Sequence, residues 1–214
     1  MKKFFLLLCL ILGLGDAVAQ TKAITDEGRE VLLLNNGTWS YVKDSTEVNL
    51  SSSDSLKLNP AKFSKSIGAS FLVKSKIFNV GVYMNPTKWT FSGHRDNEKN
   101  PEYRFSLKSG EAYVMMVTEQ TQVSLEGIRD LALLNAQKAS VDIKETAAEY
   151  RMVNGLKVLC LKMEGTVKGI KFVYFGYYYS NNNGIVQLLG FSSQQYFKTI
   201  QKEIESFLNG LVEF

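Results

Sequence analysis

Few side chains in this sequence are of a type that could carry out a reaction. His94 is the single histidine, and it stands in a polar stretch beside Arg95, Asp96 and Glu98. A general base or a zinc site would need a second histidine, a cysteine or an HxxE-type spacing near it, and the sequence supplies none. We therefore interpret His94 as a solvated loop residue.

Cys160 is the other candidate for chemistry, but apolar residues surround it in the sequence, which is typical of a buried and unreactive thiol. The chain also lacks a Gly-rich phosphate loop, a GxSxG elbow and an EF-hand loop. Four charged residues on predicted strands are expected to be exposed and paired: Glu145, Glu149, Arg151 and Glu164. We expect no catalytic residue, no cofactor-binding residue and no metal ligand.

An aromatic run, IKFVYFGYYYS at residues 170–180, is the candidate for a binding role. Because side chains alternate between the two faces of a strand, Tyr174 and Tyr178 share one face while Tyr177 and Tyr179 share the other. Two interpretations remain open. The aromatic side chains either fill the core on both faces, or the C-terminal end of the run emerges into solvent as a contact platform. The second interpretation makes the candidate binding surface Tyr174, Tyr177, Tyr178 and Tyr179.

This aromatic run is the second of three long β-prone segments that follow each other across tight turns. Asn154-Gly155 opens the first segment, Gly169 leads into the second, and Asn181–Gly184 leads into the third. Asn and Gly adopt positive φ at low cost, so they favour hairpin turns between apolar runs. The chain from Val153 to Gln195 is therefore predicted to be an antiparallel β-meander.

Shorter strands and two helices are predicted around the meander. The strands are expected near residues 71–73, 80–84, 103–107, 112–119 and 143–153, with an exposed loop at 92–101. Ser124 is a suitable cap for a helix with apolar residues at helical spacing, and a second helix runs from about Gln194 to Asn209-Gly210. This order predicts an α+β fold, an antiparallel β-sheet meander with packed helices.

The N-terminus has the pattern of a bacterial signal peptide. Lys2 and Lys3 precede an apolar run at residues 4–14 that is shorter than the ~20 residues needed to span a bilayer. Ala17-Val18-Ala19 fits a signal peptidase, so residues 1–19 are predicted to be a signal peptide cleaved after Ala19. The protein is therefore expected to be periplasmic or secreted, without stable membrane insertion after cleavage.

The remaining chain is predicted to comprise three parts. Residues 20–43 contain a β-hairpin turned by Asn35-Asn36-Gly37, and they resemble a short element near the N-termini of many secreted bacterial proteins. An isolated hairpin is marginal in water, so we expect it to dock on another surface or to be only partly ordered. Residues 44–62, rich in Ser and Asp, are predicted to be a flexible linker, and residues 63–214 form the α+β domain.

Composition limits the classes of partner and the forces that stabilise the fold. The formal net charge is +4, and lysines and arginines recur singly, so no nucleic-acid partner is expected. Cys160 would be the only cysteine left after cleavage, so no disulfide can form within the chain. Hydrophobic residues make up 45% of the sequence, which is enough material for a core to stabilise the fold alone.

Three stretches of the predicted domain resemble the PsbP/Mog1-like superfamily, which includes the bacterial DcrB-like proteins. They are GVYMNPTKW at residues 81–89, SLEGIRDLALLNAQ at 124–137, and residues 149–192, which carry the "VNG" turn and the "YYYS" strand. The resemblance implies an αβα sandwich. Members are typically non-enzymatic binding, assembly or accessory proteins, so it also implies an absence of catalysis, and no site residue can be carried over.

Two functions are compatible with these observations. One is a non-catalytic periplasmic module that binds an envelope protein partner, and the other is a carrier of a small hydrophobic ligand held between the sheet and the C-terminal helix. The carrier requires a cavity beneath Phe197, Ile200 and Ile204. A solid core at that position would argue against it.

The predicted signal peptide leads to a direct test. The mass of the protein recovered after export from a bacterial host should correspond to a chain that starts at Gln20, because the small residues at positions 17 and 19 fit the peptidase pocket. Intact-protein mass spectrometry measures this. A retained N-terminus, or an acyl group on Cys9, would contradict the prediction.

Overall fold

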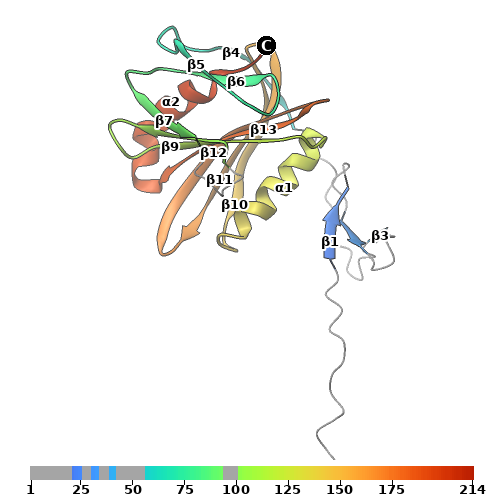
Figure 1. The fold of residues 1–214 in the computed structure, drawn as a ribbon. Helices are drawn as coiled ribbons and strands as arrows, with labels where there is room; N and C mark the ends of the chain where they lie inside the picture. Colours follow the sequence, from blue (N-terminus) through green and yellow to red (C-terminus); the bar gives the residue numbers. More distant parts are fainter. Residues whose placement is uncertain (1–20, 26–29, 34–38, 42–55, 94–100) are drawn as a thin grey trace, which may run out of the picture.

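The computed structural model describes residues 21–25, 30–33, 39–41, 56–93 and 101–214. Its centre is an eight-stranded sheet in which the predicted meander occupies the middle (Figure 1). In spatial order the strands are β4 (Leu58–Phe63), β10 (Lys144–Val153), β11 (Leu156–Val167), β12 (Ile170–Asn181), β13 (Gly184–Ser193), β9 (Tyr113–Glu119), β8 (Tyr103–Leu107) and β7 (Trp89–Gly93). All neighbours are antiparallel except β4 and β10, which run parallel.

The turns of the meander have the backbone conformation that their residues favour. Asn154 and Gly155, between β10 and β11, have φ of 48° and 87°. Lys168 and Gly169, between β11 and β12, have φ of 50° and 80°. Two consecutive residues with positive φ match the right-handed twist of the flanking strands, so each turn fixes the register of its hairpin. The predicted meander is confirmed.

Helix α2 (Gln194–Leu208) packs on one face of the large sheet, together with a small sheet of β5 (Phe71–Lys74), β6 (Val80–Met84) and β14 (Leu211–Glu213). The helix lies directly against β13. A Cβ added at Gly190 would lie 2.4 Å from Cγ2 of Ile204, so only glycine permits this approach. The main core therefore lies between α2, the small sheet and this face of the large sheet.

Helix α1 (Leu125–Gln137) packs on the opposite face. Its N-terminus is capped as predicted, because the Ser124 side chain accepts a hydrogen bond from the backbone N–H of Gly127 at 3.1 Å. Ile128 and Ala132 are buried against Tyr178 and residues of β10 and β11. With one helix on each face, the architecture is the α+β sandwich that the sequence predicted (Figure 1).

A separate three-stranded sheet precedes the domain, made of β1 (Thr21–Ile24), β2 (Glu30–Leu33) and β3 (Trp39–Tyr41). β2 and β3 are the predicted hairpin, and β1 adds a strand that the sequence did not suggest. Ala23 and Ile24 line a cavity of about 460 Å³ together with Leu131 and Leu134 of α1. Strand β1 therefore borders the outer side of α1, and docking of the hairpin itself, β2 and β3, stays a prediction.

Three predicted boundaries need correction. Residues 58–62, assigned to the flexible linker, form most of β4, which hydrogen-bonds to β10 at the edge of the sheet. Strand β7 extends into the start of the predicted loop, and β14 follows the helix that was expected to close the chain.

Residues 1–20, 42–55 and 94–100, including the predicted signal peptide, most of the linker and His94, lie outside the described residues. Within the described ranges, no helix is long and apolar enough to cross a membrane.

The packing of α2 predicts a large effect of truncating Phe207. Its ring contacts Trp89 and Phe105 at centroid distances of 4.7 and 4.8 Å, and only 3% of the residue is exposed. Phe207→Ala should lower the free energy of unfolding by roughly 3–5 kcal/mol, because it leaves a cavity among these rings. Chemical denaturation followed by tryptophan fluorescence and circular dichroism measures the change.

The matched control is Tyr196→Ala, on the exposed side of the same helix, where 40% of the residue is accessible. It should change the free energy of unfolding by less than about 0.5 kcal/mol. Equal effects of the two substitutions would contradict the packing described.

Candidate functional site

The structure buries three of the four tyrosines of the candidate binding surface. The exposed fractions of Tyr177, Tyr178 and Tyr179 are 0%, 1% and 9%, so the solvent-exposed platform expected at this end of the strand is wrong. The reason is that α1 covers Tyr178 on one face, while α2 and the small sheet cover Tyr177 and Tyr179 on the other. The alternative interpretation, in which aromatic side chains fill the core on both faces, is the one that this burial supports. Tyr174 is half-buried.

Two of the buried tyrosines use their hydroxyl groups to hold the C-terminal segment. The Tyr177 hydroxyl donates to Oδ1 of Asn209 at 2.9 Å, and the Tyr179 hydroxyl donates to the carboxylate of Glu213. Burial, with the bond to Glu213, raises the pKa of Tyr179 to about 12, and burial likewise raises the pKa of Tyr177 and Tyr178. These phenols stay protonated near neutral pH, and those of Tyr177 and Tyr179 serve as structural donors.

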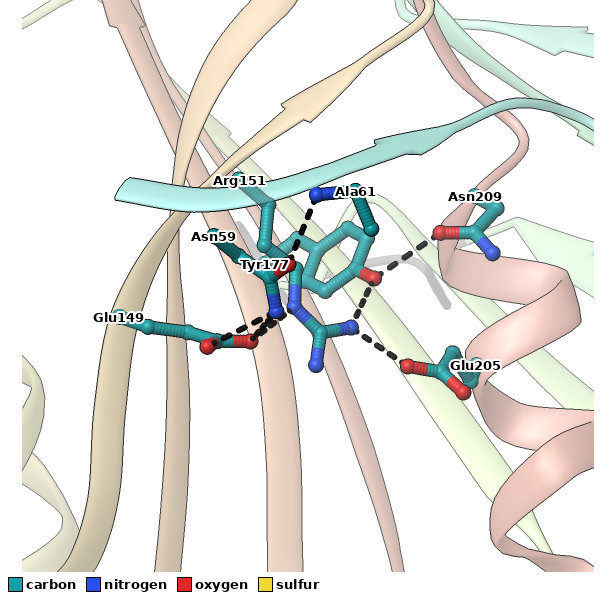
Figure 2. A network of polar contacts seen from close by, with 7 residues as sticks. All are labelled: Asn59, Ala61, Glu149, Arg151, Tyr177, Glu205 and Asn209. Carbon is teal, nitrogen blue, oxygen red and sulfur yellow. Dashed lines mark hydrogen bonds and ion pairs between the residues drawn. The ribbon is translucent and has the colours of Figure 1, made fainter. Parts of the chain in front are cut away.

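A half-buried arginine forms the most extensive polar network of the described domain (Figure 2). The Arg151 side chain is 12% exposed, and its guanidinium contacts one oxygen each of Glu149 and Glu205 at 2.5 Å. It also donates to the Tyr177 hydroxyl at 2.8 Å and stacks over the Phe63 ring at 4.4 Å. β10, β12, α2 and β4 each contribute at least one of these groups, so the network joins four elements.

The electrostatics of this network favour a structural role. Burial by itself disfavours the charge of Arg151, but its hydrogen bonds to Glu149 and Glu205 help to keep its pKa raised, so the guanidinium stays charged. The pKa of the Cys160 thiol is raised to about 12 by burial, so the thiol is protonated and unreactive. The inert thiol predicted from the sequence is thereby supported, and no group here is tuned for proton transfer near neutral pH.

The four charged strand residues were expected to be exposed, and this expectation needs correction. They are paired, but the side chain of Arg151 is only 12% exposed, and those of Glu145, Glu149 and Glu164 are 20%, 32% and 26% exposed. One sequence signal could have revealed the network. Glu149 and Arg151 are two residues apart, so they share the sheet face of Tyr177 and of the C-terminal helix.

A second buried acid, Glu102, also escaped the sequence interpretation. It is 6% exposed and accepts hydrogen bonds from the Ser75 hydroxyl at 2.8 Å, from the Lys76 backbone N–H at 2.6 Å and from the Thr118 hydroxyl. These donors satisfy the carboxylate and fix the turn after β5 to β9. Within the described residues, no group of three or more His, Cys, Asp or Glu side chains is placed to hold a metal ion.

A row of four aromatic side chains lies on the open half of the sheet, beside α1. Tyr113, Phe191 and Tyr174 face each other across β9, β13 and β12, and their rings form a row with centroid distances of 5.5 and 6.2 Å. Phe172 extends this row from Tyr174 at 6.3 Å. Tyr113 is 46% exposed and the other three residues are half-buried. We call these four residues the aromatic row.

The aromatic row lies on the α1 side of the sheet but outside the helix contact. Tyr174 and Tyr178 are four residues apart on β12 and therefore share a face. Tyr178 is covered by α1, whereas Tyr174 packs only against neighbouring rings on the sheet. Met115 and Leu189, paired across β9 and β13, are half-buried beside the row. The result is a partly exposed surface of aromatic and aliphatic groups, bordered by Arg104, which pairs with Met115 across β8 and β9.

Comparison with known proteins identifies the fold. No protein-family model and no curated protein sequence matches the chain. The solution structure of the cyanobacterial PsbP protein CyanoP from Synechocystis matches with a TM-score of 0.55 at 9% identity, over 70% of this chain and 95% of that one. The chain therefore has a PsbP-like α+β fold, as its sequence resemblance implied.

Two further structures match with lower TM-scores. A protein of unknown function from Pseudomonas aeruginosa has a TM-score of 0.43 at 8% identity, covering 67% of this chain and 96% of its own. LpqN of Mycobacterium tuberculosis, described as involved in cell envelope biogenesis, has a TM-score of 0.47 at 8% identity, covering 66% and 88%. At such identities a shared fold says nothing about shared sites.

The Arg151 network predicts a selective loss of stability. Arg151→Met should lower the free energy of unfolding by roughly 2–3 kcal/mol, less than the ~3–5 kcal/mol of a fully buried pair because both glutamates partly reach water. Adding Glu205→Gln should recover part of the loss, since it removes one of the two unpaired carboxylates. Urea denaturation of the single and double variants measures both effects.

The matched control is Arg129→Met. Arg129 makes a bidentate pair with Glu145 at 2.6 and 2.8 Å, but its side chain is 35% exposed. The substitution should cost no more than about 1 kcal/mol. If it costs as much as Arg151→Met, burial is not what makes the Arg151 network important.

Proposed function

We propose that this protein is a non-catalytic, exported binding module that recognises an envelope protein partner through the aromatic row. The observation that carries the proposal is the continuous, partly exposed row that Tyr113, Phe191, Tyr174 and Phe172 form across three strands. Aromatic side chains bury much area at low entropic cost and are enriched at protein interfaces. Export rests on the signal-peptide pattern of residues 1–19.

The state of the ionisable groups supports a role without catalysis. The Cys160 thiol and the buried tyrosine hydroxyls have raised pKa values. Arg151 and Glu102 are held by several partners each and serve the packing of strands and helix. A catalytic centre needs polar groups that converge on an accessible space with suitable pKa values, and these groups do not have that arrangement.

The packing of α2 favours a protein partner over the carrier of a hydrophobic ligand. The carrier requires a cavity beneath Phe197, Ile200 and Ile204. Phe197 and Ile204 are buried, the Phe197 ring contacts Phe175 at 6.2 Å, and Ile204 touches the backbone at Gly190. These contacts fill the space between the helix and the sheet. The aromatic row, in contrast, lies on a sheet surface that suits a protein contact.

Site-specific photo-crosslinking in the native envelope tests the proposal. A photoreactive amino acid at Tyr113 should yield a discrete crosslinked species, because this side chain lies at the exposed end of the row. The additional substitution Tyr174→Ser should weaken capture five- to thirtyfold, which corresponds to about 1–2 kcal/mol of binding energy. Circular dichroism should show that the variant remains folded.

The control places the same photoreactive group at Lys202, which is exposed on α2, the helix on the other face of the sheet from the row. No such species should form there. Equal crosslinking from both positions, or capture at position 113 that is unchanged by Tyr174→Ser, would show that the aromatic row is not the binding surface.

A further inference from the structure

A second feature, separate from the aromatic row, is a pocket of about 240 Å³ beside α2. Glu203 and Ser206 line it from the helix, Tyr83 lines it from β6, and Ser66 lines it from the chain before β5. Lys88, in the turn before β7, lies at the same pocket. The pocket volume is below the ~300 Å³ at which sites for drug-sized molecules begin, so it suits a ligand of about one ring.

Several polar groups of the pocket are not used by the protein. Within the part of the chain that the structure describes, the hydroxyls of Ser66, Tyr83 and Ser206 make no hydrogen bond. Asn85 accepts from Thr87 through Oδ1 at 2.9 and 2.7 Å, which leaves its Nδ2 group as a donor. These groups reach solvent in the pocket, so a ligand could bond to them without breaking any protein contact.

The charges of the pocket cancel. Lys88 Nζ lies 2.7 Å from Oε1 of Glu203, and the two side chains are 50% and 37% exposed. An exposed pair of this kind contributes no more than about 1 kcal/mol, so its members can turn toward ligand groups at low cost. Glu203 disfavours an anion and Lys88 disfavours a cation. The pair therefore favours a neutral ligand that both donates and accepts hydrogen bonds.

One wall of the pocket is apolar. Trp89 and Phe207 line it and contact each other at 4.7 Å, and because each is 3% exposed, only small parts of their rings reach the pocket. Gly68 lies opposite, and a Cβ there would meet Nδ2 of Asn85 at 2.8 Å, so glycine keeps that side open. A ligand with a C–H surface on one side and several hydroxyls on its edge matches an apolar wall surrounded by donors and acceptors.

We propose that this pocket binds a single neutral sugar ring. The ring would rest against the apolar wall while its hydroxyls bond to Ser66, Ser206 and the Lys88–Glu203 pair. This function is additional to partner binding by the aromatic row, and either can fail without the other. The envelope to which the protein is expected to be exported would expose the pocket to sugar units.

Ligand-observed NMR by saturation transfer tests the proposal with four probes at 1–50 mM, concentrations chosen for a weak site of about millimolar affinity. Glucose and N-acetylglucosamine should show transfer and should shift the backbone amides of Lys88 and Glu203. Glucose 6-phosphate and glucosamine should bind more weakly because each carries a net charge. Absence of transfer from both neutral sugars, or tighter binding of either charged probe, would overturn the proposal.

Two substitutions locate the binding. Ser206→Leu fills the pocket and should weaken binding of N-acetylglucosamine at least tenfold, or ~1.4 kcal/mol. Thr199→Leu, at an exposed position of the same helix, should leave binding unchanged. If Ser206→Leu lowers the melting temperature, Lys88→Met serves in its place and should weaken binding severalfold through the lost donor. Binding that is unaffected by Lys88→Met, or equally affected by Thr199→Leu, would place the sugar elsewhere and overturn the assignment.

Discussion

Strand β12 is covered on both faces around Tyr177, Tyr178 and Tyr179, and the rest of the fold depends on this coverage. Tyr178 points to α1, and Tyr177 and Tyr179 point to the α2 side. Burying consecutive tyrosines carries hydroxyl groups into the interior, where an unpaired one costs ~1–3 kcal/mol. Asn209 and Glu213 accept the hydrogen bonds of Tyr177 and Tyr179. The C-terminal segment is therefore held in place by apolar packing and by the need to satisfy these buried donors.

The need to pair polar groups in the interior also determines the edge of the sheet, through Arg151. A guanidinium under α2 must be paired, and Glu205 of the helix and Glu149 of β10 provide the charges. Asn59 of β4 donates to both oxygens of Glu149 at 3.1 and 3.0 Å (Figure 2), and Phe63 of β4 lies under the guanidinium. These contacts add to the backbone hydrogen bonds that hold β4, the parallel strand at the edge of the sheet. Through Asn59 and Phe63, β4 completes the surroundings of the Arg151 charge.

The parts of the fold that sequence could predict are those determined by neighbouring residues. Asn154-Gly155 and the Ser124 cap act within a few residues, and both the meander and α1 were anticipated. β4 and β14 are short strands held by partners about 90 and 130 residues away in the sequence, so no local pattern indicates them. Alternation assigned each tyrosine of β12 to a face, but it could not show that both faces would be covered. The aromatic row was missed for the same reason, since Tyr113 and Phe191 become neighbours only through the pairing of β9 and β13.

The dimensions of the sheet explain why an apolar surface remains open. Eight strands at a spacing of ~4.8 Å make a sheet about 35 Å wide, whereas one helix is about 10 Å across. On the α2 side, the small sheet of β5, β6 and β14 helps to cover the difference. On the other side, α1 packs on β10, β11 and β12 and reaches Ile185 at the start of β13, which leaves the rest of β13 and β9 outside the helix contact. An antiparallel sheet normally places polar residues on such a water-facing area. Here Tyr113, Met115, Leu189 and Phe191 occupy it instead, and this departure is the physical reason to assign partner binding to the open half of the sheet.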